Sequence, residues 1–161
     1  MIPKMTKYRF QFIAIVVLAI IATGSFAQDR RTPDTKVADI LAQMPTKDLV
    51  HRDRVMNETV ELGPEGFQKI SALLVAPGTG DDTAVRFALN SLSRYVSQFG
   101  KEAEKDFVGT QLLTALGKPS DKMVMTFLLN QLNLGGGEKT VAVVKNYLND
   151  ETLCEPATQT L

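Results

Sequence analysis

Residue types that commonly build chemical sites are scarce in this sequence. It contains one cysteine, one histidine and no tryptophan among its 161 residues. With Cys154 alone, no disulfide can form within the chain, so packing must hold the fold together. His51 has no second histidine with which to form a metal site. We therefore expect no metal site, no cofactor site and no disulfide framework.

An excess of positive charge is missing as well. The sequence has 18 lysines and arginines against 18 aspartates and glutamates, and its basic residues form no long run. Proteins that bind nucleic acid or anionic lipid need a basic surface to neutralise phosphate groups. Neither is therefore expected as a partner, and a protein is the expected partner, of unknown identity.

The N-terminal segment combines a basic start with one short apolar run. Lys4, Lys7 and Arg9 precede the run FQFIAIVVLAII at residues 10–21. A membrane anchor needs roughly 20 apolar residues to cross a bilayer, and this run is well short of that. The pattern predicts a signal peptide over residues 1–27, with no stable membrane span after its removal.

Small residues follow this run at the two positions that a signal peptidase reads, Ser25 and Ala27. We expect cleavage between Ala27 and Gln28, and export of the mature chain to the periplasm or the extracellular space. Residues 28–33 are polar and lack periodicity, which predicts a flexible leader. Residues 34–161 are then sufficient for one domain.

Apolar residues recur at steps of three and four through most of residues 34–161, which is the period of a helix. The clearest stripe consists of Val85, Ala88, Leu89, Leu92, Val96 and Phe99. No stretch sustains the alternation of a strand. The sequence therefore predicts an all-α domain with six or more helices joined by short breaks.

The breaks between the expected helices repeat. Three of them share the pattern Gly-x-Glu, namely Gly63 with Glu65, Gly100 with Glu102 and Gly136 with Glu138. A glycine after a helix can adopt a left-handed conformation that pairs the last carbonyls, and a glutamate in the next first turn is favoured by the helix dipole. Each pattern is expected to end one helix and begin another.

A second set of landmarks alternates with the first. Asp48, Asp81 and Asp121 are each expected to cap a helix, and each is followed nine residues later by an asparagine. Those asparagines are Asn57, Asn90 and Asn130. The same alignment extends to a helix opening at Asp150, where Cys154 takes the place of Val85 and Leu161 that of Leu92. Alternation of the two landmarks predicts repeating helical hairpins.

The hairpin pattern resembles HEAT and armadillo-like repeats over residues 48–161. The matching positions are Asp81 or Asp82, Val85, Arg86, Ala88 and Leu92 in a first helix, and Gly63, Pro64 and Glu65 at the start of a second. The resemblance implies a short right-handed α-solenoid of stacked antiparallel hairpins. Only one repeat carries the family's arginine, since Asp53, Thr126 and Glu155 replace it elsewhere, so a regular polar ladder is in doubt. A non-repeating helical bundle stays open as an alternative.

The stretch NLGGGEKTVAVVK, residues 133–145, invites comparison with a phosphate-binding loop. Such a loop needs G-x-x-x-x-G-K-[ST] after a buried strand. Here Glu138 stands where the glycine before the lysine should be, and a helix precedes the glycines. We interpret the stretch, like PGTGDD at residues 77–82, as a turn between helices.

Other chemically suggestive residues have simpler interpretations. His51 is expected on a solvated helix face, and Cys154 as a small core residue without a nearby base. The charged run KEAEKD, residues 101–106, is expected to face solvent. Met123 and Met125 are interpreted as core residues. No catalytic, cofactor-binding or metal-binding residue is therefore predicted.

The predicted function is an exported, non-catalytic scaffold for protein–protein interaction, because stacked hairpins present a continuous binding surface. The pattern stops at Leu161 without a second helix or a capping repeat, which predicts truncation at the C-terminal end. An alternative is therefore the N-terminal repeat arm of a longer exported enzyme. A compact bundle that encloses a small apolar ligand is a third possibility.

Overall fold

The computed structural model describes residues 29, 31–118 and 121–161. Contacts between Cα atoms divide the chain into two units, Met1–Arg31 and Thr32–Leu161. The predicted signal peptide and its cleavage site lie outside the described residues. Every helix of the described residues belongs to the second unit.

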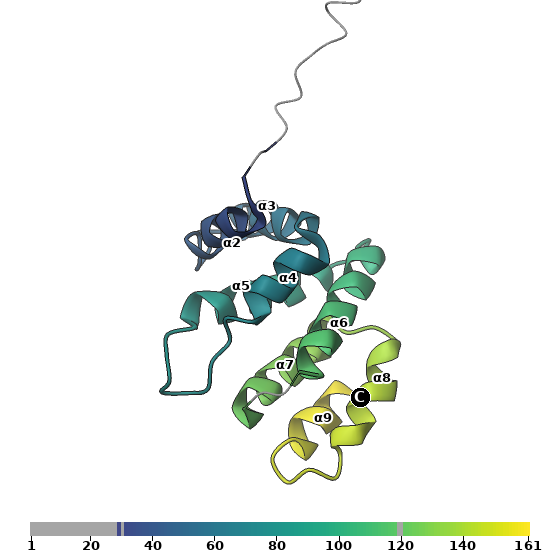
Figure 1. The fold of residues 1–161 in the computed structure, drawn as a ribbon. Coiled ribbons are helices and arrows are strands. Elements are labelled where there is room, and N and C mark those ends of the chain that lie inside the picture. The colour runs from purple at the N-terminus through teal and green to yellow at the C-terminus, as the bar shows by residue number, and fades with distance from the viewer. Residues whose placement is uncertain (1–28, 30, 119–120) are drawn as a thin grey trace, which may run out of the picture. The chain divides into compact units, whose positions relative to one another are not determined.

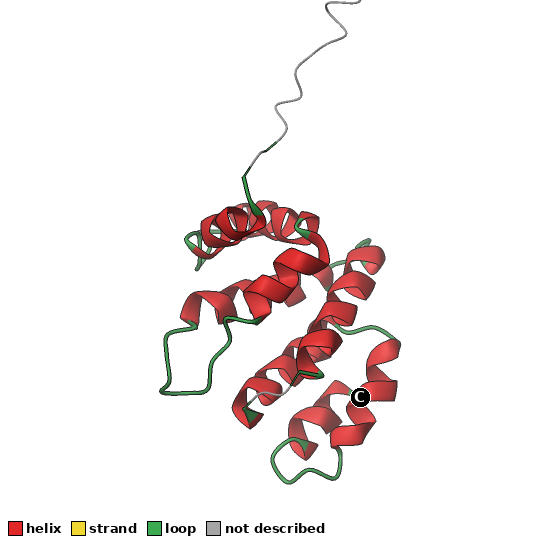
Figure 2. Ribbon diagram, viewed as in Figure 1, coloured by secondary structure: helices red, strands yellow, loops and turns green. Residues whose placement is uncertain are grey.

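The described part of this unit is all helical, with eight α-helices, one short 3₁₀ helix and no strand (Figures 1 and 2). They are α2 (Pro33–Leu41), α3 (Leu49–Glu61), α4 (Gly63–Ser71), α5 (Thr83–Val96), α6 (Glu102–Leu116), α7 (Lys122–Gly135), α8 (Lys139–Val144), η1 (Lys145–Tyr147) and α9 (Cys154–Thr160). The all-α prediction is confirmed for these residues. None of these helices has the length and apolar character that a membrane crossing requires.

Aspartates cap the helices much as the sequence predicts. The Asp48 carboxylate accepts a bond from the His51 N–H at 2.8 Å at the start of α3. Asp121 accepts one from the Met123 N–H at 2.8 Å at the start of α7. The N-cap position of α5 is held by Asp82, whose side chain makes no cap bond, and the predicted Asp81 carboxylate accepts from the Thr83 N–H at 3.0 Å. Each satisfied N–H removes the cost of an unpaired donor at a helix end.

Two of the three Gly-x-Glu breaks have the expected backbone. Gly63 and Gly100 have φ angles of +67° and +82°, in the left-handed region that residues with a Cβ atom rarely adopt. At Gly136 the prediction is wrong, because its φ is −78° and its ψ 158°. The chain leaves α7 there in an extended conformation, which needs no left-handed residue.

Each helix packs on the next but one along the chain. α3 contacts α5, α5 contacts α7 and α7 contacts α9, and we call these four helices the first row. α2 contacts α4, α4 contacts α6 and α6 contacts α8, and these form the second row. Contacts between α3 and α4 and between α5 and α6 join the rows (Figure 1).

The core lies between the two rows and is mostly apolar, and its buried polar residues are Thr59, Ser93, Gln111, Gln131 and Thr140. Its largest fully buried side chains are Phe67, Met56, Ile70, Leu89, Leu92, Leu112, Leu116, Leu128, Leu129, Leu132, Leu153 and Val55. They come from α3 to α7, with Leu153 just before α9, as expected when amphipathic helices bury one stripe each. One continuous core therefore runs through the described part of the unit.

Several expectations near helix ends are wrong. Phe99, placed at the end of the clearest stripe, is fully exposed, because α5 ends at Val96 and the chain turns. Leu161, aligned with buried Leu92, is 52% exposed. A helix does not open at Asp150 but at Cys154, so that Pro156 falls in the first turn, where no backbone donor is needed.

Candidate functional site

The triglycine segment, residues 135–137, is a packing contact between helices. A Cβ at Gly135 would lie 3.2 Å from the Ser93 Oγ of α5, and one at Gly136 would clash with the Leu132 carbonyl and the Thr140 hydroxyl. From the other side, a Cβ at Gly109 of α6 would lie 3.1 Å from the Gly135 carbonyl. A Cβ would thus clash at Gly136 and be tightly packed at Gly135 and Gly109, so glycine lets α5, α6 and the end of α7 approach closely.

An open hollow of about 640 Å³ adjoins this segment. It is lined by Glu102, Lys105, Asp106, Gly136, Gly137, Glu138 and Lys139. Three carboxylates and two ammonium groups line the hollow, so its lining has a net negative charge. A phosphate would meet net repulsion here.

Polar side chains join α3 to α5 in the first row. The Tyr95 hydroxyl donates to the Asn57 side-chain oxygen at 3.3 Å and accepts from the Lys101 ammonium at 2.7 Å. This bond raises the pKa of Lys101 above its ordinary value, although partial burial opposes the shift. Lys101, predicted to face solvent, thus joins the turn after α5 to Tyr95 and, through Tyr95, to Asn57 of α3.

Further polar contacts join α5 to α7 and to the α4–α5 connection. The Asn90 amide donates to the Gln131 side-chain oxygen at 3.3 Å, and Gln131 is buried. Arg86 donates through Nε to Asp82 at 2.8 Å and through an Nη to the Val75 carbonyl at 3.2 Å. The landmark asparagines Asn57 and Asn90 therefore bridge helices, whereas no hydrogen bond among the described residues joins the Asn130 side chain to another helix.

The two rows expose different chemistry. Exposed positions of the first row include a set of apolar and arginine side chains, namely Leu49, Val50, Arg54, Phe87, Arg94, Met123 and Leu134. Those of the second row are mostly acidic, small or hydroxylated, among them Asp34, Glu65, Glu102, Ala103, Asp106, Thr110 and Thr114, with Val141 as an apolar exception. Phe, Met and Arg are the residues enriched in protein interfaces.

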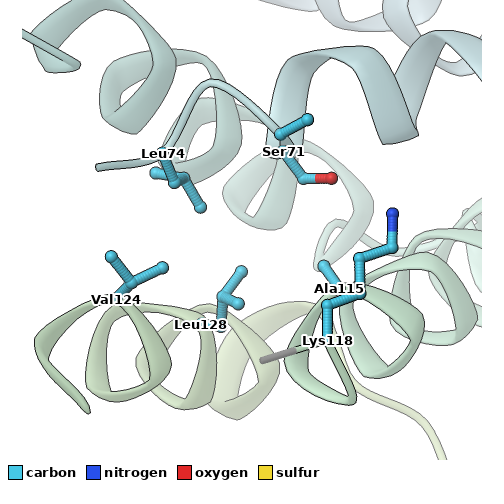
Figure 3. A pocket seen from close by; sticks show the side chains of 7 residues that line it. Ser71, Leu74, Ala115, Lys118, Val124 and Leu128 are labelled. Atoms are coloured by element: carbon cyan, nitrogen blue, oxygen red, sulfur yellow. The ribbon is translucent and has the colours of Figure 1, made fainter. Parts of the chain in front are cut away.

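A smaller and more enclosed cavity lies where α4, α6 and α7 meet (Figure 3). Its volume is about 140 Å³. The lining residues are Ser71, Ala72, Leu74, Ala115, Lys118, Val124 and Leu128. Aliphatic side chains form most of the wall, and Ser71 and Lys118 supply its polar side-chain groups.

The residues singled out from the sequence do not converge on one site. His51 Nδ1 accepts from the Lys47 N–H at 3.2 Å and Nε2 lies 3.2 Å from the Gln43 side-chain oxygen, so the ring ties α3 to the α2–α3 connection. Cys154 is half-buried at the start of α9, not in the core. Met123 is exposed, contrary to expectation, and Met125 packs against the core.

Within the described ranges, no three His, Cys, Asp or Glu side chains gather closely enough to share a metal ion. The cavity was not foreseen, since Ser71 and Lys118 are 47 positions apart and belong to no motif. Comparison with protein-family models, with curated proteins and with solved structures found no match.

Proposed function

We propose that this protein is an exported, non-catalytic scaffold that binds another protein through a short HEAT-like stack of helical hairpins. The observation that carries the proposal is the packing order, in which each helix contacts the next but one and the contacts continue from α3 to α9. Stacked repeats make contacts of this nearest-neighbour kind. The basic and apolar N-terminal segment supports export.

The contact face is assigned to the exposed side of the first row. Phe87 and Met123 are 45% and 52% exposed there, on the adjacent helices α5 and α7. Arg94 is exposed on the same row. Large apolar groups beside arginines are typical of residues that dominate binding energy, whereas the acidic and small side chains of the second row are not.

Site-specific photo-crosslinking in the producing cells tests this assignment. A benzoylphenylalanine replaces Phe87 in the full chain, and a matched control places it at exposed Gln68 of α4, in the second row. We expect a discrete adduct with one protein at the first position and none at the second. The purified partner should then bind the wild-type chain and lose about tenfold in affinity or more with Phe87→Glu, since interface residues of this kind contribute over 1 kcal/mol.

Two outcomes would overturn the proposal. One is the absence of a discrete adduct at every exposed position of the first row. The other is turnover of a substrate by the purified chain that a substitution on that row abolishes, which would favour an enzyme. The competing repeat-arm hypothesis predicts the same adducts, and the intact mass and N-terminal sequence of the native protein separate the two.

A further inference from the structure

We propose that the cavity between α4, α6 and α7 is a binding site for a short branched aliphatic carboxylate, a site that goes beyond scaffold function and does not depend on it. The same chemistry is offered by a free carboxylic acid and by the C-terminal residue of a peptide.

The position of the cavity follows from the way helices end. Ser71 is the last residue of α4, and Leu74 lies in the connection to α5. Ala115 is in the last turn of α6, and its small side chain leaves the space open. Val124 and Leu128 are one turn apart on α7 and form the opposite wall.

The size of the cavity limits the ligand. Its volume of about 140 Å³ is close to that of an engineered apolar cavity of about 150 Å³ that binds benzene. A branched group of four to six carbons therefore fits, whereas a long acyl chain or a nucleoside does not. The aliphatic wall supplies the favourable transfer of such a group from water.

The distribution of charge around the cavity indicates which polar group the ligand carries. Lys118 is the charged lining residue, and no carboxylate of the described residues lines the space. None of the hydrogen bonds and ion pairs among the described residues uses its ammonium group. Figure 3 shows the Ser71 hydroxyl and the Lys118 ammonium on one side of the cavity, with Leu74 and Val124 on the other. A ligand whose aliphatic group fills the cavity would thus have its other end beside the Lys118 ammonium, which favours a carboxylate at that end.

Titration of the full chain with 4-methylpentanoate, followed by the methyl NMR signals of Val124 and Leu128, tests the site. The neutral 4-methylpentanamide is the matched ligand control. We expect saturable shifts with the acid and about tenfold weaker binding of the amide, the difference that a charge-assisted hydrogen bond contributes. An N-acetylated peptide ending in leucine, compared with its C-terminal amide, distinguishes a peptide source from a free acid.

Two variants complete the test. Lys118→Gln should remove the preference for the acid without changing the fold, because Lys118 is exposed, whereas Lys139→Gln outside the cavity should not. Ala115→Leu should fill the cavity and abolish binding, with Ala142→Leu on the exposed side of α8 as its control. Absence of methyl shifts with either acid, equal binding of acid and amide, or acid preference that survives Lys118→Gln would each overturn the proposal.

Discussion

Arg86 of α5 lies over the ring of Phe127 of α7, with its guanidinium carbon 4.8 Å from the ring centroid. The same guanidinium bonds Asp82 and the Val75 carbonyl. One side chain therefore joins the α4–α5 connection, α5 and the next helix of the first row. Arg86 is the position that matches the arginine of HEAT-like repeats. The aligned residue of α7 is Thr126, which has no positive charge, so α7 cannot form the same junction.

Replacement of Arg86 tests how much this junction contributes to stability. Arg86→Ala removes a cation–π contact and leaves the half-buried Asp82 without its ion-pair partner, so we expect the free energy of unfolding to fall by about 1–3 kcal/mol. Arg86→Lys should recover only part of this loss, because lysine cannot reproduce the planar fork. Urea unfolding followed by circular dichroism measures the change. The control Arg94→Ala, at an exposed arginine bonded within its own helix, should change stability by less than about 0.5 kcal/mol.

Asp82 makes stability depend on acid pH. The Arg86 guanidinium first, and the Val75 N–H with it, hold the pKa of Asp82 below its ordinary value, although burial opposes the shift. A carboxyl with a lowered pKa in the folded state stabilises fully above its unfolded pKa near about 4. That contribution is lost as pH falls through the lowered value.

We therefore expect the stability difference between wild type and Asp82→Asn to be largest at neutral pH and to shrink as pH falls below about 4. Urea midpoints measured from neutral to acid pH provide the comparison. Asp81 and Asp150 also have lowered pKa values, so the difference between the two proteins, not the wild-type slope, isolates Asp82. In the Arg86→Ala background, the stability difference between Asp82 and Asp82→Asn should vary little with pH. An unchanged pH dependence there would contradict the role given to the Arg86–Asp82 pair.

The triglycine segment should tolerate substitution poorly although none of its three glycines has a positive φ. Gly136→Ala places a methyl group against the Leu132 carbonyl and the Thr140 hydroxyl, and overpacking of this kind costs about 1–3 kcal/mol. Gly80→Ala is the matched control, because its Cβ would make an ordinary contact with Val75 at 3.4 Å. Thermal unfolding of the two variants should show a lower midpoint for Gly136→Ala alone, and equal midpoints would sink the packing interpretation.

The sequence predicted the parts of the fold that local chemistry determines. Helical period, the caps at Asp48 and Asp121, and left-handed Gly63 and Gly100 all depend on residues close in the chain. Burial near helix ends could not be predicted in the same way. Phe99 continues the apolar period of α5, yet the helix ends three residues earlier, and periodicity alone carries no information on where a chain turns.

The candidate site was less predictable than the fold. The cavity depends on the small side chain of Ala115 facing the ends of two other helices, which is a property of packing and not of any motif. The landmark asparagines were visible in the sequence, but their partners were not. Tyr95 and Gln131 lie 38 and 41 positions from Asn57 and Asn90, and no local rule pairs residues at such separations.

Tyr95 provides the last prediction, because its hydroxyl joins α3 to the turn after α5. The ring is buried, and its hydroxyl bonds both Asn57 and Lys101. Tyr95→Phe keeps the ring and removes both bonds, so we expect a loss of about 0.5–1.5 kcal/mol in the free energy of unfolding. Tyr147→Phe is the control, since no hydrogen bond among the described residues uses the Tyr147 hydroxyl.

The raised pKa of Lys101 adds a second readout. A lysine whose pKa is raised in the folded state contributes its full stabilisation below its unfolded pKa of about 10.4, and that contribution is lost as pH rises through the folded value. Wild type should therefore lose stability at alkaline pH more steeply than Lys101→Met, which keeps the Tyr95 hydroxyl, and parallel curves would show that the Lys101 bond contributes nothing.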